Sequence, residues 1–105
     1  MPTLQELEGP IERRIASALI EATPDSWQQA RLEVEVSEEG GVLGMPHTIL
    51  SPEGWREVVG ATDEILAATF ELRELFKKHG RAWRRCIFEI TQQEGSWRYV
   101  AHFDY

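Results

Sequence analysis

The sequence contains few of the residues on which common catalytic and metal-binding functions depend. Its single cysteine, Cys86, excludes an internal disulfide, and its place in an alternating strand pattern predicts a small buried residue. The three histidines and the cysteine show no zinc-like spacing such as Cys-x-x-Cys or His-x-x-x-His. No Gly-x-Ser-x-Gly occurs, and Gly40-Gly41 lacks the Lys-Ser/Thr of a phosphate loop. We therefore expect no catalytic residues, no cofactor and no metal.

Targeting and membrane signals are equally scarce. The chain opens Met-Pro-Thr-Leu-Gln-Glu, without the basic start and apolar run of a signal peptide. No apolar run approaches the roughly 20 residues that a membrane-spanning helix needs. With 42% hydrophobic residues and four tryptophans, the 105 residues are instead typical of one folded domain, residues 1–105. We expect a cytoplasmic location.

Negative charge is concentrated in the first part of the chain. The formal net charge is −7, and residues 1–40 carry nine acidic and three basic side chains. This part would repel phosphates, which argues against direct binding to nucleic acid or an anionic membrane and is compatible with a basic protein partner. Charge alone favours a simpler interpretation, that acidic residues keep a small domain in solution. Arg81, Arg84 and Arg85 surround Trp83, and we expect Arg84 or Arg85 to pair with nearby carboxylates.

The clearest predicted element is a helix over residues 62–80. Thr62 is a suitable N-cap, and Gly80 can take the left-handed conformation that often ends a helix. Residues at helical spacing form one mostly apolar stripe: Ile65, Ala68, Thr69, Leu72, Leu75 and Phe76. Phe70 lies off this stripe. We expect it to pack under a neighbouring helix, with an exposed anchor for a partner as the alternative.

A second amphipathic helix is predicted over residues 3–22, where Gly9-Pro10 either kinks the helix or marks its true start at Pro10. Residues 28–36 and 83–91 alternate with a period of two, and each is followed by a turn and a returning strand. Pro46 places the first returning strand, Val42–Leu50, at a sheet edge or breaks it at a bulge. Residues 51–60 read as a short helix.

These elements predict an α+β fold. We expect an antiparallel sheet of two hairpins, about four strands in all, with two long helices and one short helix packed on it. Five aromatic residues are expected in the core or at its rim: Trp27, Trp83, Trp97, Phe103 and Tyr105.

Several short motifs become specific in combination. In chain order they are Pro24-Asp25-Ser26-Trp27 after the first helix, Leu72-Arg73-x-x-Phe76 at the end of another, Trp83 at the start of a strand, Gly95 in a hairpin, and Phe103-Asp104-Tyr105. This order resembles the YezG-type immunity (antitoxin) proteins of bacterial polymorphic toxin systems, over about residues 10–105. The resemblance implies a non-catalytic α+β domain that binds a cognate toxin, typically a nuclease, and inhibits it.

An acidic surface suits such a role, because a nuclease cleft that holds phosphates is cationic. We predict that the first hairpin makes the contact, with an aromatic anchor nearby, since aromatic residues dominate interface hot spots. The predicted partner-binding residues are Glu33, Glu35, Glu38 and Glu39, with Trp55 or Phe70 as the anchor. The simpler interpretation is a solvated strand face for the glutamates and packing alone for each aromatic residue.

Two other functions stay open at this point. One is a small cytoplasmic adaptor or homodimeric scaffold with no toxin partner, pairing through the edge strand at Pro46 or through an aromatic patch. The other is a small hydrolase that uses carboxylates or histidines. It is the weakest hypothesis, because Glu33 and Glu35 lie on the open side of a hairpin, where no cleft encloses them.

Overall fold

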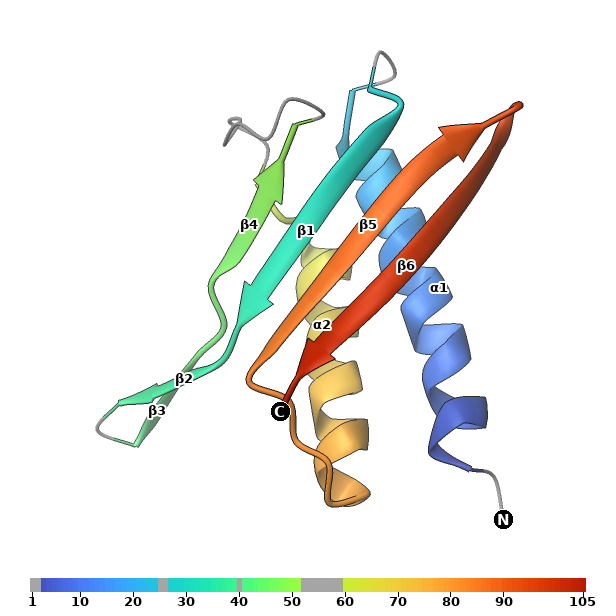
Figure 1. The fold of residues 1–105 in the computed structure, drawn as a ribbon. Coiled ribbons are helices and arrows are strands. Elements are labelled where there is room, and N and C mark those ends of the chain that lie inside the picture. Colours follow the sequence, from blue (N-terminus) through green and yellow to red (C-terminus); the bar gives the residue numbers. More distant parts are fainter. Residues whose placement is uncertain (1–2, 25–26, 40, 52–59) are drawn as a thin grey trace.

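The computed structural model describes residues 3–24, 27–39, 41–51 and 60–105. It has two layers, a four-stranded antiparallel sheet and two helices on one of its faces (Figure 1). In chain order the elements are α1 (Leu4–Ala22), β1 (Gln29–Glu35), β2 (Ser37–Glu39), β3 (Val42–Gly44), β4 (His47–Leu50), α2 (Asp63–Lys78), β5 (Arg85–Gln93) and β6 (Ser96–Asp104). The predicted α+β class is confirmed. Neither described helix has the length and apolar character needed to cross a membrane.

Helix α2 begins and ends as the sequence predicts. The Thr62 hydroxyl accepts a hydrogen bond from the Ile65 amide at 3.3 Å, and Gly80 has a φ of +71° just beyond the helix. Its buried residues are Ile65, Ala68, Thr69, Leu72, Arg73 and Phe76. The predicted stripe is therefore buried almost as expected, and a charged residue, Arg73, extends it on one side.

Helix α1 passes through Pro10 without ending. The Thr3 side chain accepts a hydrogen bond from the Glu6 amide at 3.2 Å, so the helix starts before the Gly9-Pro10 pair rather than at it. Proline has no N–H to donate to the Glu6 carbonyl. Because Pro10 is exposed, that carbonyl is on the solvated side of the helix. Its buried residues, Ile15, Ala16, Ala18 and Leu19, lie in the second half of α1, which packs beside α2.

The sheet has the strand order β4-β1-β5-β6, and all neighbours are antiparallel. Leu32 of β1 lies opposite both Ile49 of β4 and Phe88 of β5, which places these apolar side chains on the helix side. Strands β5 and β6 are joined by Glu94 and Gly95, both with positive φ, as in the tight turns that favour hairpins. No described element covers the other face, called here the open face (Figure 1).

The core lies between the sheet and the two helices. It combines β-branched and aromatic side chains of the sheet with the helix stripes, and its largest fully buried members are Trp83, Phe76, Phe88, Ile15, Leu19, Leu32 and Ile65. Phe103 packs between Phe76 and Trp83, with ring centroids 4.8 and 6.2 Å away. Cys86 is buried, as predicted.

The first predicted hairpin needs a correction. Residues 42–50 form two strands, of which β3 pairs with β2 in a separate two-stranded ribbon while β4 pairs with β1. The chain breaks at Met45-Pro46 because proline cannot donate to a ladder, and β4 lies at the sheet edge, as Pro46 predicts. In Figure 1 the β2–β3 ribbon projects from one corner of the sheet. Residues 52–59, most of the predicted short helix, lie outside the described residues.

Two aromatic residues are placed differently from expectation. Phe70 is 48% exposed, so the prediction that it packs under a neighbouring helix is wrong. The buried side of α2 is completed by Thr69 and Arg73, which leaves Phe70 on the solvated flank. Tyr105 is 52% exposed rather than at the core rim, and the Arg81 guanidinium lies over its ring, 5.1 Å from the centroid.

Candidate functional site

Glu33 and Glu35 lie on the open face of β1, as the alternation of the strand predicts. With Pro46 and Thr48 they line a shallow groove of about 240 Å³ beside the edge strand β4. The Glu33 side chain is only 21% exposed and forms an ion pair with Arg85. Glu35 is exposed and forms no ion pair with the described residues. Of the two carboxylates, only Glu35 is therefore uncompensated.

The Glu33 pair belongs to a longer charge network on the open face. Arg31 lies between the Glu33 and Glu89 carboxylates, with nitrogen–oxygen distances of 3.8 and 3.5 Å. The expected pairing of Arg84 or Arg85 with a carboxylate is confirmed for Arg85. Two arginines thus meet two carboxylates, and the network is neutral as a whole.

Glu38 is held in a different environment. It lies on β2 of the ribbon, and its carboxylate accepts a hydrogen bond from Arg73 of α2 at 2.9 Å. Arg73 also donates to its neighbour Glu74 at 3.2 Å. The Arg73 side chain is 8% exposed, whereas Glu38 and Glu74 are 64% and 42% exposed. Burial of a guanidinium costs several kcal/mol of desolvation, which ion pairs with carboxylates offset. The two carboxylates therefore hold Arg73 in place, and Glu38 fixes the ribbon against the helix.

Next to Arg73, a second polar contact joins α2 to the sheet edge. The His47 Nδ1 of β4 lies 2.6 Å from the Met45 carbonyl, and its Nε2 lies 2.8 Å from the Thr69 hydroxyl. Burial lowers the pKa of His47, and the hydrogen bond to the Met45 carbonyl acts in the opposite direction. The neutral imidazole is thus favoured. His47 is a partly buried strand residue, as the sequence predicts.

The remaining predicted site residues are divided between the described and undescribed parts of the chain. Phe70 is exposed one turn before Glu74 on α2. Trp55 and the side chain of Glu39 lie outside the described residues. Of the predicted site, the structure places Glu38 against Arg73, which lies three residues after the exposed Phe70, while Glu33 and Glu35 lie on the opposite face of the sheet.

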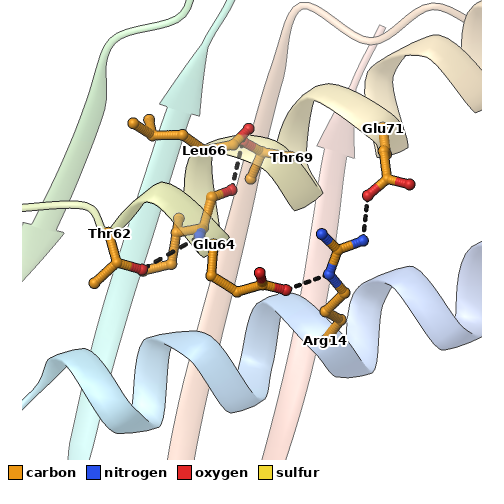
Figure 2. A network of polar contacts seen from close by, with 7 residues as sticks. Arg14, Thr62, Glu64, Leu66, Thr69 and Glu71 are labelled. Atoms are coloured by element: carbon orange, nitrogen blue, oxygen red, sulfur yellow. Dashed lines mark hydrogen bonds and ion pairs between the residues drawn. The ribbon is translucent and has the colours of Figure 1, made fainter.

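A third arginine joins the two helices. Arg14 of α1 forms ion pairs with both Glu64 and Glu71 of α2, which are seven residues apart and so lie on one helix face (Figure 2). The two carboxylates raise the pKa of Arg14 through their hydrogen bonds. All three side chains are between 38% and 52% exposed. This cluster carries two negative charges and one positive charge on the helix surface.

One pair of acidic side chains faces the sheet rather than solvent. Glu8 and Glu12 of α1 lie one turn apart, and Glu12 approaches Tyr99 of β6. Partial burial, followed by a hydrogen bond and charge repulsion from Glu8, raises the pKa of Glu12 from 4.5 to about 7. Burial first, and then the charge of Glu12, also raise the pKa of Tyr99.

Candidate metal ligands do not converge in the part of the chain that the structure describes, where no group of three or more histidine, cysteine or acidic side chains could hold a metal ion. Burial raises the pKa of the Cys86 thiol to about 12, so it stays protonated at neutral pH. His79 lies within hydrogen-bonding distance of the Leu75 carbonyl at the end of α2, and His102 lies on the open face opposite Ile87.

Arg73 is the residue of this region that the sequence pattern did not mark as part of a site. The sequence did contain a clue to its burial. Arg73 lies four residues after Thr69 and three before Phe76, which places it at the margin of the buried stripe. A charged residue at that position must find a partner, and the partner comes from β2, 35 residues away.

Comparison with known proteins assigns the chain to no family. A scan of the chain against protein-family models gave no match, and a search of curated proteins gave none. The resemblance to YezG-type immunity proteins is therefore a basis for a proposal only.

Proposed function

We propose that this chain is a non-catalytic immunity protein that binds and neutralises a cognate toxin, a nuclease, through an acidic surface. The observation that carries the proposal is the excess of carboxylates over arginines on both flanks of α2. Glu64 and Glu71 share Arg14 on the flank next to α1.

On the other flank, Glu38 and Glu74 share Arg73. Each of the two sets has a net charge of −1, and its carboxylates are at least 42% exposed.

Such a surface suits a cationic partner for two physical reasons. Carboxylates that are only partly compensated leave a negative potential that speeds the approach of a basic protein. A nuclease cleft is positively charged because it holds phosphates, so an acidic domain can occupy it in place of the nucleic acid. Close charge pairs across the barnase–barstar interface, a nuclease–inhibitor complex, couple by about 1.5–7 kcal/mol.

Co-expression tests the proposal directly. The product of the gene next to that of this chain is expressed with and without the chain, and growth is scored. We expect the wild-type chain to restore growth and to form a complex with that protein. Reversal of Glu35, Glu38 and Glu39 to lysine is expected to abolish protection while the circular dichroism spectrum still shows a folded domain, less stable than the wild type because Glu38 pairs with the buried Arg73. Failure of the wild-type chain to protect or to bind would contradict the proposal.

A homodimeric scaffold is the second candidate, and the position of β4 favours it. Among the described strands β4 lies at the sheet edge and pairs with β1 alone, so its outer edge is available to a strand from a second copy. This function predicts a concentration-dependent dimer in sedimentation equilibrium. A monomer at all concentrations would exclude it and leave the immunity function untouched.

A further inference from the structure

Two neighbouring apolar side chains are exposed on α2. Leu66 and Phe70 are 43% and 48% exposed, and their spacing of four residues places them side by side on the helix surface. The large exposed hydrophobic residues among those described are Leu7, Leu66, Phe70, Val100 and Tyr105. Of these, Leu66 and Phe70 alone are neighbours on one face of one element. They form a small apolar patch that solvent reaches.

Carboxylates adjoin this patch. Arg73 and Glu74 lie three and four residues after Phe70, so both are its neighbours on the helix surface. Arg73 binds Glu38 of β2 at 2.9 Å, which brings the ribbon to the same place. Because one buried guanidinium serves both Glu38 and Glu74, one negative charge stays uncompensated. The surface formed by Leu66, Phe70, Glu38 and Glu74 is called the α2–ribbon corner.

The ends of this flank do not change its charge. Asp63 lies in the first turn of α2 and Lys77 in the last, and both are exposed. Their opposite charges balance. With both included, the flank keeps a net charge of −1, and Lys77, three residues after Glu74, adjoins the corner at its C-terminal end.

The open face of the sheet has a different character. Its Glu33 and Glu89 carboxylates are matched by Arg31 and Arg85 in a neutral network. Its exposed apolar residue, Val100, has charged neighbours and no apolar partner of comparable exposure. A basic partner therefore gains less at Glu33 and Glu89, because an ion pair with either must replace one that already exists. Glu35 is the one carboxylate of β1 on this face that has no such pair among the described residues.

We propose that the toxin binds at the α2–ribbon corner rather than on the open face, although Glu33 and Glu35 lie on that face. The partner segment carries an apolar side chain that packs on Leu66 and Phe70, flanked by a lysine or arginine that binds Glu38 and Glu74. This arrangement has an aromatic anchor inside a polar rim, as interface hot spots have. The inference rests on the proposed function, because it names the surface through which that function acts.

Matched variants on the two faces test this inference. Phe70→Ala is paired with Val100→Ala, and Glu38→Gln with Glu35→Gln, so that each face loses one exposed apolar and one acidic side chain. The affinity of each purified variant for the product of the adjacent gene is measured by calorimetry. We expect a loss of at least about tenfold for Phe70→Ala and for Glu38→Gln, and less than about threefold for the two controls.

The outcomes separate the inference from the function that it refines. Binding that survives Phe70→Ala and Glu38→Gln but falls with Glu35→Gln and Val100→Ala would overturn the corner and leave the immunity function standing. Equal losses from both faces, or none from either, would also overturn it. If the wild-type chain binds nothing, the proposed function itself fails. Unfolding curves of the four variants show whether each tested protein is folded. Glu38→Gln is expected to lose stability, because it weakens the pairing of the buried Arg73, so its affinity is measured where the curve shows it fully folded.

Discussion

Replacing Glu12 with glutamine is expected to stabilise the protein above neutral pH and to have little effect in acid. Glu12 lies beside Glu8 and Tyr99, and its partial burial raises its pKa from 4.5 to about 7. A carboxyl with a raised pKa binds its proton more tightly in the folded state than in the unfolded state. Its contribution to stability is therefore complete below pH 4.5 and is lost as the pH rises through about 7.

The size of the effect follows from the same shift. A rise from 4.5 to about 7 corresponds to at most about 3.4 kcal/mol of stability between the two pH limits. Glu12 is only half-buried, so solvent screening reduces this figure, and we expect about 1–2 kcal/mol. Glutamine keeps the size and the hydrogen-bonding capacity of the side chain but cannot ionise, so the variant does not lose this stability.

Urea unfolding measured from pH 4 to pH 8 gives the free energy of unfolding for both proteins. The expected result is a difference near zero at pH 4 that grows to about 1–2 kcal/mol in favour of Glu12→Gln at pH 8. Glu21→Gln is the control, because Glu21 is an exposed carboxylate on the same helix. A difference between Glu12→Gln and wild type that is the same at every pH would refute the reasoning.

Two further predictions concern the core and the sheet edge. Phe88→Ala removes a fully buried ring and should lower the free energy of unfolding in urea by about 3–5 kcal/mol. Val100→Ala, at a site 53% exposed, should change it by no more than about 0.5 kcal/mol. Equal losses of stability in the two variants would contradict the assignment of the two sheet faces. Burial lowers the pKa of His47, so the wild-type protein should lose stability as the pH falls below 6.5, and His47→Gln should lose less over the same range. Parallel stability curves for His47→Gln and wild type would contradict the burial of that imidazole.

Local patterns were sufficient to predict most of the fold. The cap at Thr62, the stripe that ends at Phe76 and the alternation around Phe88 each depend on neighbouring residues, and each is found in the structure. The break at Pro46 was also predictable, because proline cannot take part in a ladder. The separate β2–β3 ribbon could not be predicted from the sequence, because it depends on the path of the chain on either side of the break.

The candidate site depended on contacts that are distant in sequence. Alternation correctly placed Glu33 and Glu35 on one face, but it could not show that Arg85 neutralises Glu33 from 52 residues away. Nor could it show that Arg73 holds Glu38. Phe70 was expected to pack under a neighbouring helix, but α2 buries Thr69 and Arg73 on that side, which leaves Phe70 exposed.

The salt dependence of affinity tests the proposed acidic contact most directly. The affinity of the wild-type chain for the product of the adjacent gene is measured by titration calorimetry between low and high ionic strength. If carboxylates around α2 face a cationic cleft, a one-to-one complex should form, and its affinity should fall steadily as salt screens the charges. A complex whose affinity does not change with salt, or the absence of any complex, would contradict the acidic contact.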